Sequence, residues 1–335
     1  MKKFFATFVM AVAAIFTLAA AEPVKIIFDT DMGNDVDDVV ALDMLYKYLD
    51  EGAIELLGII SSKREVGSVK LIDAMNTLYG YPNIPVGIVK TYPEENYTCT
   101  DKRLNYADYT VAAHPYPHTI TDWEAVEDGY KLIRRLLAEQ PDKSVTFVTV
   151  GFSTNMARLL ASKGDEHSPL DGKSLMAQKA DKVVIMAGNF HERKKEYNIY
   201  KDHFAAVRFV AECPVPMLFT DYALGKSTLY PYQTVENGFK YTENHPLVVA
   251  FNYYAQMPYN RPLWDPTAVL FAVEGHKGYA SLSKSGYVTV DEKDITDFTE
   301  DKHSNRRYYE VNDKQRAAIV RRIVELTERT PKKFQ

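Results

Sequence analysis

The feature that most constrains the fold is the alternation of short β-branched runs with stretches of helical spacing. The runs expected to be strands are Val24–Phe28, Glu55–Ser61, Pro85–Val89, Ser144–Val150, Lys182–Met186 and Pro216–Thr220. The expected helices, each with an apolar face, are Val36–Glu51, Val66–Tyr79, Trp123–Gln140, Asn155–Ser162 and His203–Cys213. Strands that alternate with helices in this way build parallel sheets. We therefore expect an α/β fold with an open, mostly parallel sheet covered by helices on both faces.

One large domain accounts for the chain after its first residues. No internal repeat and no Gly/Ser-rich or Pro-rich linker divides the 335 residues, of which 46% are hydrophobic. Three irregular segments are interpreted as functional loops: Thr91–Thr121, Arg261–Pro266 and Gly286–Asp301. The expected boundaries are a leader over residues 1–21 and a single domain over residues 22–335.

The leader has the pattern of a secretory signal peptide. Lys2 and Lys3 precede the apolar run Phe4–Leu18, and Ala19–Ala21 supplies small residues for cleavage before Glu22. The run is shorter than the ~20 residues that a membrane-spanning helix needs. We expect an exported protein, periplasmic or secreted, with no membrane attachment after cleavage.

Charge and cysteine content narrow the choice of partners. Loss of the two leader lysines changes the formal net charge from −5 to −7, and no basic stripe suggests binding of a nucleic acid polymer. Cys99 and Cys213 are too few for a disulfide framework, and one bridge or two separate thiols are both open. The expected partner is a small molecule, and assembly into a homo-oligomer is open.

The strongest functional signal is the acidic segment after the first expected strand. Its five carboxylates belong to Asp29, Asp31, Asp35, Asp37 and Asp38. Ligands of open α/β sheets bind at the carboxyl ends of the strands. Carboxylates crowded there repel one another unless a hard cation neutralises them, and Ca²⁺ takes about six to eight oxygen ligands. Helix capping explains Asp35 but not the whole set, so the sequence predicts a metal site.

Two other interpretations of this segment are weaker. An EF-hand needs Gly at its sixth position and Glu at its twelfth, where a loop counted from Asp29 has Asn34 and Val40. A phosphatase with an aspartyl nucleophile would use Asp29 and Asp31, but it gives the pair Asp37–Asp38 no role.

The stretch Asp29–Leu42 resembles the N-terminal signature of the nucleoside hydrolase family, of the inosine/uridine-preferring type, with two extra residues before the paired acids. Three later motifs resemble the same family in the same order: Val150–Asn155, Glu196–Asn198 and Trp264–Pro266. The resemblance runs from Val24 to about Val273 and implies an N-ribohydrolase that acts on a small riboside.

The resemblance implies a role for each matching residue. Asp31, Asp38 and Asp265 would ligate Ca²⁺ together with the backbone carbonyl of Val150. Water on the metal would attack the anomeric carbon while Asp31 takes its proton, and Asp37 would hold the ribose 2′-hydroxyl. The remaining sugar-binding residues would be Asn189, Glu196 and Asn198.

Ordinary structural roles are also open for the later motifs. Asp265–Pro266 could simply start a helix over Thr267–Val273. The charged stretch His191–Lys195 could place Glu196 and Asn198 on a solvated loop.

Trp264 is the main departure from the family, whose members have a His there that helps to protonate the departing base. Trp264 could stack on a flat heterocycle or pack in the core. The missing proton could come from His191, Tyr253, Tyr254 or Tyr259.

A second departure follows the expected strand Glu55–Ser61, where the family has Gly-Asn. Lys63 or Arg64 could face an anionic group of the substrate, or both could lie on a solvated basic loop. The sequence thus predicts calcium-dependent hydrolysis of the N-glycosidic bond of a ribonucleoside or related riboside. The alternative is a non-catalytic ribose- or nucleoside-binding protein that keeps the metal site.

Overall fold

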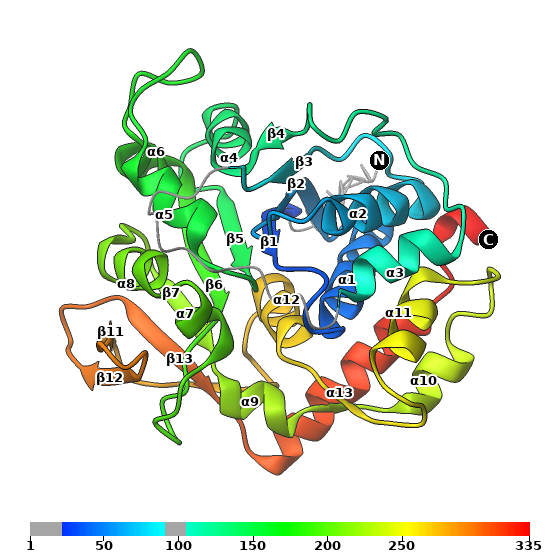
Figure 1. Cartoon of the computed structure of the whole chain (residues 1–335). Coiled ribbons are helices and arrows are strands. Elements are labelled where there is room, and N and C mark those ends of the chain that lie inside the picture. The colour runs from blue at the N-terminus through cyan, green and yellow to red at the C-terminus, as the bar shows by residue number, and fades with distance from the viewer. Residues whose placement is uncertain (1–21, 91–104) are drawn as a thin grey trace, which may run out of the picture.

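A mostly parallel sheet forms the centre of the protein (Figure 1). The structure, a computed structural model, describes residues 22–90 and 105–335, so the expected leader and Cys99 lie outside the described residues. Eight neighbouring strands run parallel, in the order β4 (Glu127–Asp128), β3 (Val86–Ile88), β2 (Ile54–Ser61), β1 (Val24–Thr30), β5 (Val145–Thr149), β6 (Ala180–Met186), β7 (Met217–Thr220) and β13 (Arg306–Glu310). The predicted fold class is confirmed.

Antiparallel strands complete one edge of the sheet. Beyond β13 lie β10 (Ser281–Leu282) and the hairpin of β11 (Gly286–Val290) and β12 (Thr296–Glu300). A separate two-stranded sheet pairs β8 (Leu229–Tyr230) with β9 (Arg261–Pro262). The prediction of an irregular loop over Gly286–Asp301 was wrong, because Val288 and Phe298 pack the hairpin against the core.

Helices cover both faces of the sheet. One face carries α1 (Asp37–Glu51), α2 (Val66–Tyr79), α11 (Pro246–Tyr254), α12 (Asp265–Glu274) and α13 (Asp313–Thr327), on the right in Figure 1. The other carries α4 (Gly129–Ala138), α5 (Thr154–Ala161), α6 (Gly172–Lys179) and α8 (His203–Glu212), on the left. Shorter helices are α3 (Tyr106–Ala113), α7 (Tyr197–Lys201), α9 (Tyr222–Ser227), α10 (Tyr232–Asn237) and a 3₁₀ turn at Lys332–Phe334.

The first strand shows why both faces are apolar. Ile26 and Phe28 belong to the core cluster on one side of the sheet, and Ile27 belongs to the cluster on the other. Successive side chains of a strand point to opposite faces, so a strand buried on both sides reads as a continuous apolar run.

Two expected elements differ from the structure. The predicted helix Trp123–Gln140 is shortened to Gly129–Ala138, because Glu127–Asp128 pairs with β3 as a strand. Part of the segment Thr91–Thr121 forms α3, which begins where the side chain of Asn105 accepts a hydrogen bond from the backbone N–H of Asp108. The segment is therefore not irregular throughout.

The order in which the strands are added to the sheet reverses between β1 and β5. Strands β2 to β4 extend from β1 towards one edge, while β5 to β7 extend towards the other. The loops after β1 and β5 diverge at such a point and leave a crevice for ligands. Among the described residues, no helix has the length and apolar character needed to cross a membrane.

Candidate active site

A small pocket lies at the carboxyl ends of the central strands. Its cavity of about 80 Å³ is lined by Asp31, Asn34, Asp35, Val150, Met186, Glu196, Tyr197, Asn198, Tyr222, Trp264 and Asp265. Six residues singled out in the sequence therefore meet here: Asp31, Val150, Glu196, Asn198, Trp264 and Asp265. Asp37, Asp38 and Asn189 are buried but do not line this cavity.

Close approach of two backbones brings Asp31 and Val150 together. Strands β1 and β5 pair Asp29 with Thr149, and the N–H of Val150 donates to the carbonyl of Asp29 over 2.8 Å. A Cβ on Gly151 would lie 2.4 Å from the backbone nitrogen of Asp31, so only glycine fits at that position.

Asp31 is held by a short polar relay. The side-chain amide of Asn34 donates to Oδ2 of Asp31 over 2.6 Å, and Nζ of Lys63 donates to Oδ1 of Asn34 over 2.9 Å. Burial raises the pKa of Asp31 to about 7, although Asn34 and Lys63 oppose that shift. Lys63 is 1% exposed and also pairs with Glu65 at 3.1 Å, so the solvated-loop interpretation was wrong for Lys63.

Asp37 ties the first loop to the segment before α12. Its Oδ1 accepts from Nε and a terminal nitrogen of Arg261 at 3.3 and 3.1 Å. Its Oδ2 accepts from the backbone N–H groups of Trp264 and Asp265 at 2.8 and 3.1 Å. Both carboxylate oxygens are thus occupied by protein donors, and the assigned contact with a ribose hydroxyl stays a prediction.

Asp35 is the lining residue that sequence reasoning assigned elsewhere. Helix α1 begins at Asp37 after Val36, with no side-chain cap, so the capping interpretation of Asp35 was wrong. The Asp35 carboxylate instead accepts from the hydroxyl of Tyr254 over 2.7 Å and pairs with Arg261 at 2.8 Å, while 48% of the side chain stays exposed. The sequence did contain a signal for Asp35. The two extra residues before the paired acids leave two aspartates after Gly33, Asp35 and Asp37, and either could face the cavity.

Asp38 and Asp265 complete a group of buried carboxylates. Thr30 donates its hydroxyl to Oδ1 of Asp38, whereas the buried Oδ2 has no hydrogen-bond partner. Burial, followed by repulsion from neighbouring aspartates, raises the pKa of Asp38 and of Asp265 well above the usual range. Such a group is costly to bury unless a proton or a cation compensates it.

The donor atoms fit a hard cation by their chemistry. The carboxylates of Asp31, Asp38 and Asp265 and the carbonyl of Val150 are oxygen ligands of the kind that Ca²⁺ binds, and Oδ2 of Asp38 is free for it. Within residues 22–90 and 105–335, no group of three His, Cys, Asp or Glu side chains is arranged to hold a metal as it stands.

Glu196 and Asn198 are buried, so the solvated-loop interpretation was wrong for both. Glu196 caps α7 by accepting from the backbone N–H groups of Asn198 and Ile199 at 2.9 and 3.2 Å, and burial raises the pKa of Glu196 to about 7. The side-chain amide of Asn198 donates to the carbonyl of Val150 over 2.8 Å. These contacts fix the backbone that carries both side chains into the cavity.

Aromatic rings form the wall of the cavity next to Asp265. Trp264 stacks on Tyr222 with ring centroids 5.7 Å apart, and its indole N–H donates to the carbonyl of Tyr222 over 3.0 Å. The guanidinium of Arg261 lies 5.1 Å from the Trp264 ring centroid. As expected, α12 starts at Asp265–Pro266, two residues earlier than Thr267.

The suggested proton donors lie outside the lining of this cavity. His191 is half-exposed and its Nε2 lies 3.9 Å from the buried Asp221. Tyr254 donates to Asp35, and Tyr259 donates to the carbonyl of Phe251 over 2.9 Å. Tyr253 is exposed.

The chain matches the family model described as inosine-uridine preferring nucleoside hydrolase over residues 26–326. It therefore belongs to this family and is a hydrolase that acts on N-glycosyl compounds, with a small-molecule nucleoside as the fitting substrate. No curated protein sequence matches the chain.

Solved structures with the same fold are distant in sequence. The purine-preferring ribonucleoside hydrolase from Gardnerella vaginalis has a TM-score of 0.71 at 19% identity, over 91% of this chain and 99% of that one. The inosine-uridine preferring nucleoside hydrolase from Bacillus anthracis has 0.65 at 19%, over 90% and 99%. The type III effector XopQ, solved with adenosine diphosphate ribose, has 0.64 at 14%, over 92% and 94%.

Proposed function

We propose that the protein hydrolyses the N-glycosidic bond of a ribonucleoside, or of a related riboside, in a calcium-dependent reaction. The observation that carries the proposal is the convergence of Asp31, Asp265 and the Val150 carbonyl on one cavity, beside the unpartnered Oδ2 of Asp38. A bound Ca²⁺ would neutralise these carboxylates and acidify a water molecule at the site.

Asp31 is the residue best suited to accept a proton from the attacking water. It lines the cavity, it is 5% exposed, and the relay from Lys63 through Asn34 orients its carboxylate. A general base must lie within hydrogen-bond reach of the proton that it takes, which the lining position allows. Negative charge around the cavity also stabilises the oxocarbenium-like transition state.

The polar groups that line the cavity are proposed to bind the sugar. Asp35 is proposed to accept from a ribose hydroxyl, because it lines the cavity and 48% of its side chain is exposed, whereas Asp37 is buried and lies outside the lining. Glu196 and Asn198 are proposed to bind the other hydroxyls, and Asn189 remains a further candidate. Asp37 holds the backbone of Trp264 and Asp265, and its contact with the ribose 2′-hydroxyl stays part of the proposal.

The leaving group is proposed to be a flat heterocycle that stacks on Trp264. Trp264 lines the cavity and packs against Tyr222 and Arg261, and aromatic rings bind planar heterocycles. A neutral base that has no acid beside it is a poor leaving group, so turnover should depend strongly on the base.

The test combines binding with two kinds of substrate. Isothermal titration of Ca²⁺ and then ribose should show binding, and p-nitrophenyl riboside, whose leaving group needs no acid, should be cleaved together with at least one of inosine, adenosine, uridine and cytidine. Adenosine diphosphate ribose belongs in the panel because XopQ was solved with it. Failure to bind Ca²⁺ and to cleave every compound would refute the proposal.

The second candidate is a binding protein without turnover. The observation that favours it is that no histidine lines the cavity in the described part of the chain. Binding of Ca²⁺ and ribose without cleavage of p-nitrophenyl riboside would select it.

Export is proposed for the leader over residues 1–21, followed by function in the periplasm or outside the cell. Its lysines, apolar run and small residues support cleavage before Glu22. N-terminal sequencing of exported protein should begin at Glu22, and retention of Met1 in the cytoplasm would contradict the proposal.

A further inference from the structure

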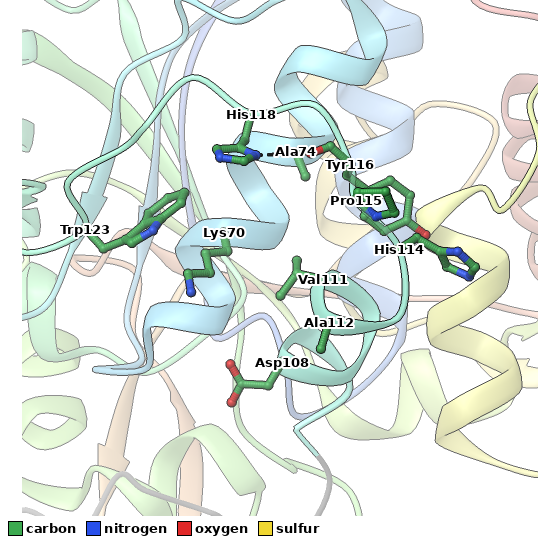
Figure 2. A pocket seen from close by; sticks show the side chains of 10 residues that line it. All are labelled: Lys70, Ala74, Asp108, Val111, Ala112, His114, Pro115, Tyr116, His118 and Trp123. Atoms are coloured by element: carbon green, nitrogen blue, oxygen red, sulfur yellow. Dashed lines mark hydrogen bonds between the residues drawn. The ribbon is translucent and has the colours of Figure 1, made fainter.

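A second pocket lies apart from the candidate active site. It has a volume of about 480 Å³ and shares no lining residue with the cavity around Asp31. Figure 2 shows that Lys70 reaches it from α2, Asp108 reaches it from α3, and Trp123 stands at its side on the segment that follows α3. Its size falls within the range of small-molecule pockets, about 300–1,000 Å³.

Three kinds of surface meet in this pocket. Ala74, Val111 and Pro115 supply an apolar lining. The ammonium of Lys70 lies 5.5 Å from the Trp123 ring centroid, and no described carboxylate forms a salt bridge with it. Asp108, an exposed residue, supplies a carboxylate on the opposite helix.

These groups match the chemistry of a free nucleobase. An indole ring can stack on a planar heterocycle whatever its substituents, because every base has a π face. A carboxylate accepts from ring N–H or amino groups, and an ammonium donates to ring nitrogens or carbonyl oxygens. A ligand with both donors and acceptors could use the Lys70 ammonium and the Asp108 carboxylate together with the apolar lining.

A chain of polar contacts joins this pocket to the candidate active site. It runs in order through Asp108, Asn105, Glu65, Lys63, Asn34 and Asp31. The side-chain amide of Asn105 donates to Asp108 over 2.5 Å and also to Glu65. Asn105 also caps α3. A ligand that forms a hydrogen bond with Asp108 would therefore change the contacts of Asn105 and, through them, both the start of α3 and the relay to Asp31.

We propose that this pocket is a second binding site for a free heteroaromatic base, and that its occupancy alters the positioning of Asp31. The identity of the ligand rests on the proposed function, because a base is what that reaction would release. The site would make turnover sensitive to accumulated product at a place distinct from the catalytic cavity.

Tryptophan fluorescence can test binding without any turnover. The chain has two tryptophans, so Trp264→Phe leaves Trp123 as the only tryptophan, whose emission can be excited selectively at the red edge of the absorption band. Adenine should quench its emission saturably, and Lys70→Met or Asp108→Asn in that background should weaken binding about tenfold, the effect of losing a charge-assisted hydrogen bond. The matched control is Lys131→Met, an exposed lysine on α4 outside the pocket.

No saturable quenching up to the solubility limit of adenine would overturn the second site. Quenching that both variants leave unchanged would also overturn it, provided that circular dichroism shows both to be folded. Because this readout needs no cleavage, loss of activity with intact quenching would count against the proposed function alone.

The coupling is tested with p-nitrophenyl riboside, which releases no base. Adenine should lower kcat of the wild-type enzyme, and Lys70→Met should abolish the kcat effect while competitive inhibition at the catalytic cavity remains. An adenine effect confined to the apparent KM in the wild type would overturn the coupling.

Discussion

Helix α1 carries three buried carboxylates, and the surroundings of two of them, Asp38 and Asp43, differ. Asp38, in the first turn, accepts one hydrogen bond from the hydroxyl of Thr30 and is repelled by Asp31 and other aspartates. Asp43, one turn and a half further on, has Lys47 at 3.4 Å and accepts from the hydroxyl of Tyr79. A carboxylate with its own ammonium is a structural element, whereas a cluster that lacks one is poised to bind something positive.

Asp43, Lys47, Tyr79 and His245 form a second cluster, distinct from the first cluster of Asp31, Asp38 and Asp265. The second cluster also anchors the C-terminal part of the chain. Nζ of Lys47 donates to the carbonyls of Thr327 and Arg329 at 3.1 and 2.5 Å. His245 accepts the backbone N–H of Leu247 and contacts the Tyr79 hydroxyl at 2.9 Å. Removal of charge should therefore have opposite consequences at the two places.

The largest effect is expected for Asp38→Asn. Loss of this carboxylate should lower kcat/KM for p-nitrophenyl riboside on the order of 10³-fold, since metal-assisted charge stabilisation is worth several kcal/mol. Unfolding free energy measured in EDTA should stay equal or rise, because a repulsive buried charge is gone. Asp181→Asn, at an exposed aspartate, is the control and should leave both quantities unchanged. Full activity of Asp38→Asn would remove Asp38 from the site.

Lys47→Met should act on stability alone. It leaves Asp43 buried and uncompensated, which typically costs about 3–5 kcal/mol of unfolding free energy. Urea denaturation measures the loss, and Lys131→Met, at an exposed position, serves as control. If kcat below the melting temperature fell as far as in Asp38→Asn, the separation of the two clusters would be wrong.

Ca²⁺ should stabilise the protein through the first cluster only. At about 100 times its Kd, a ligand that binds only the native state adds about 2.7 kcal/mol to the unfolding free energy. Thermal unfolding with and without EDTA should show this gain in the wild type and in Lys47→Met but not in Asp38→Asn. An equal gain in all three proteins would place the ion elsewhere.

The second cluster should also respond to acid. Burial and the nearby Lys47 lower the pKa of His245 from its ordinary 6.5 to about 3. Because the folded pKa lies below the unfolded one, stability is complete above pH 6.5 and declines as pH falls towards 3, by up to about 1.4 kcal/mol per pH unit. Urea denaturation at pH 7 and pH 5 measures it against His245→Gln, which should show a smaller loss. Equal losses in both proteins would contradict the prediction.

Local patterns made much of the site predictable. The acids after the first strand and Glu196–Asn198 sit beside strand ends that the hydrophobic pattern reveals, and six of the predicted residues line one cavity. Partners distant in sequence were invisible: Asp37 is held by Arg261, 224 positions away. The same limit applies to Lys63, whose ammonium donates to Asn34, 29 positions away.

The fold shows a similar division. Buried parallel strands and amphipathic helices are specified by their own apolar spacing and were expected near their observed bounds. The β11–β12 hairpin and the two-residue strands β4, β8, β9 and β10 owe their existence to neighbours across the sheet. Short strands carry too few residues for a periodic signal of their own.

The hydrogen bonds of Asp37 to Arg261, Trp264 and Asp265 determine when the candidate active site can form during synthesis. One carboxylate near the beginning of the chain must capture Arg261 and the amides of Trp264 and Asp265, which are synthesised last among the residues around the cavity. A nascent chain that ends before these residues can form β1 and α1, but it lacks the groups that hold the Asp37 carboxylate. Catalytic competence would therefore arrive as one of the final events of synthesis and folding, well after the sheet has begun to form.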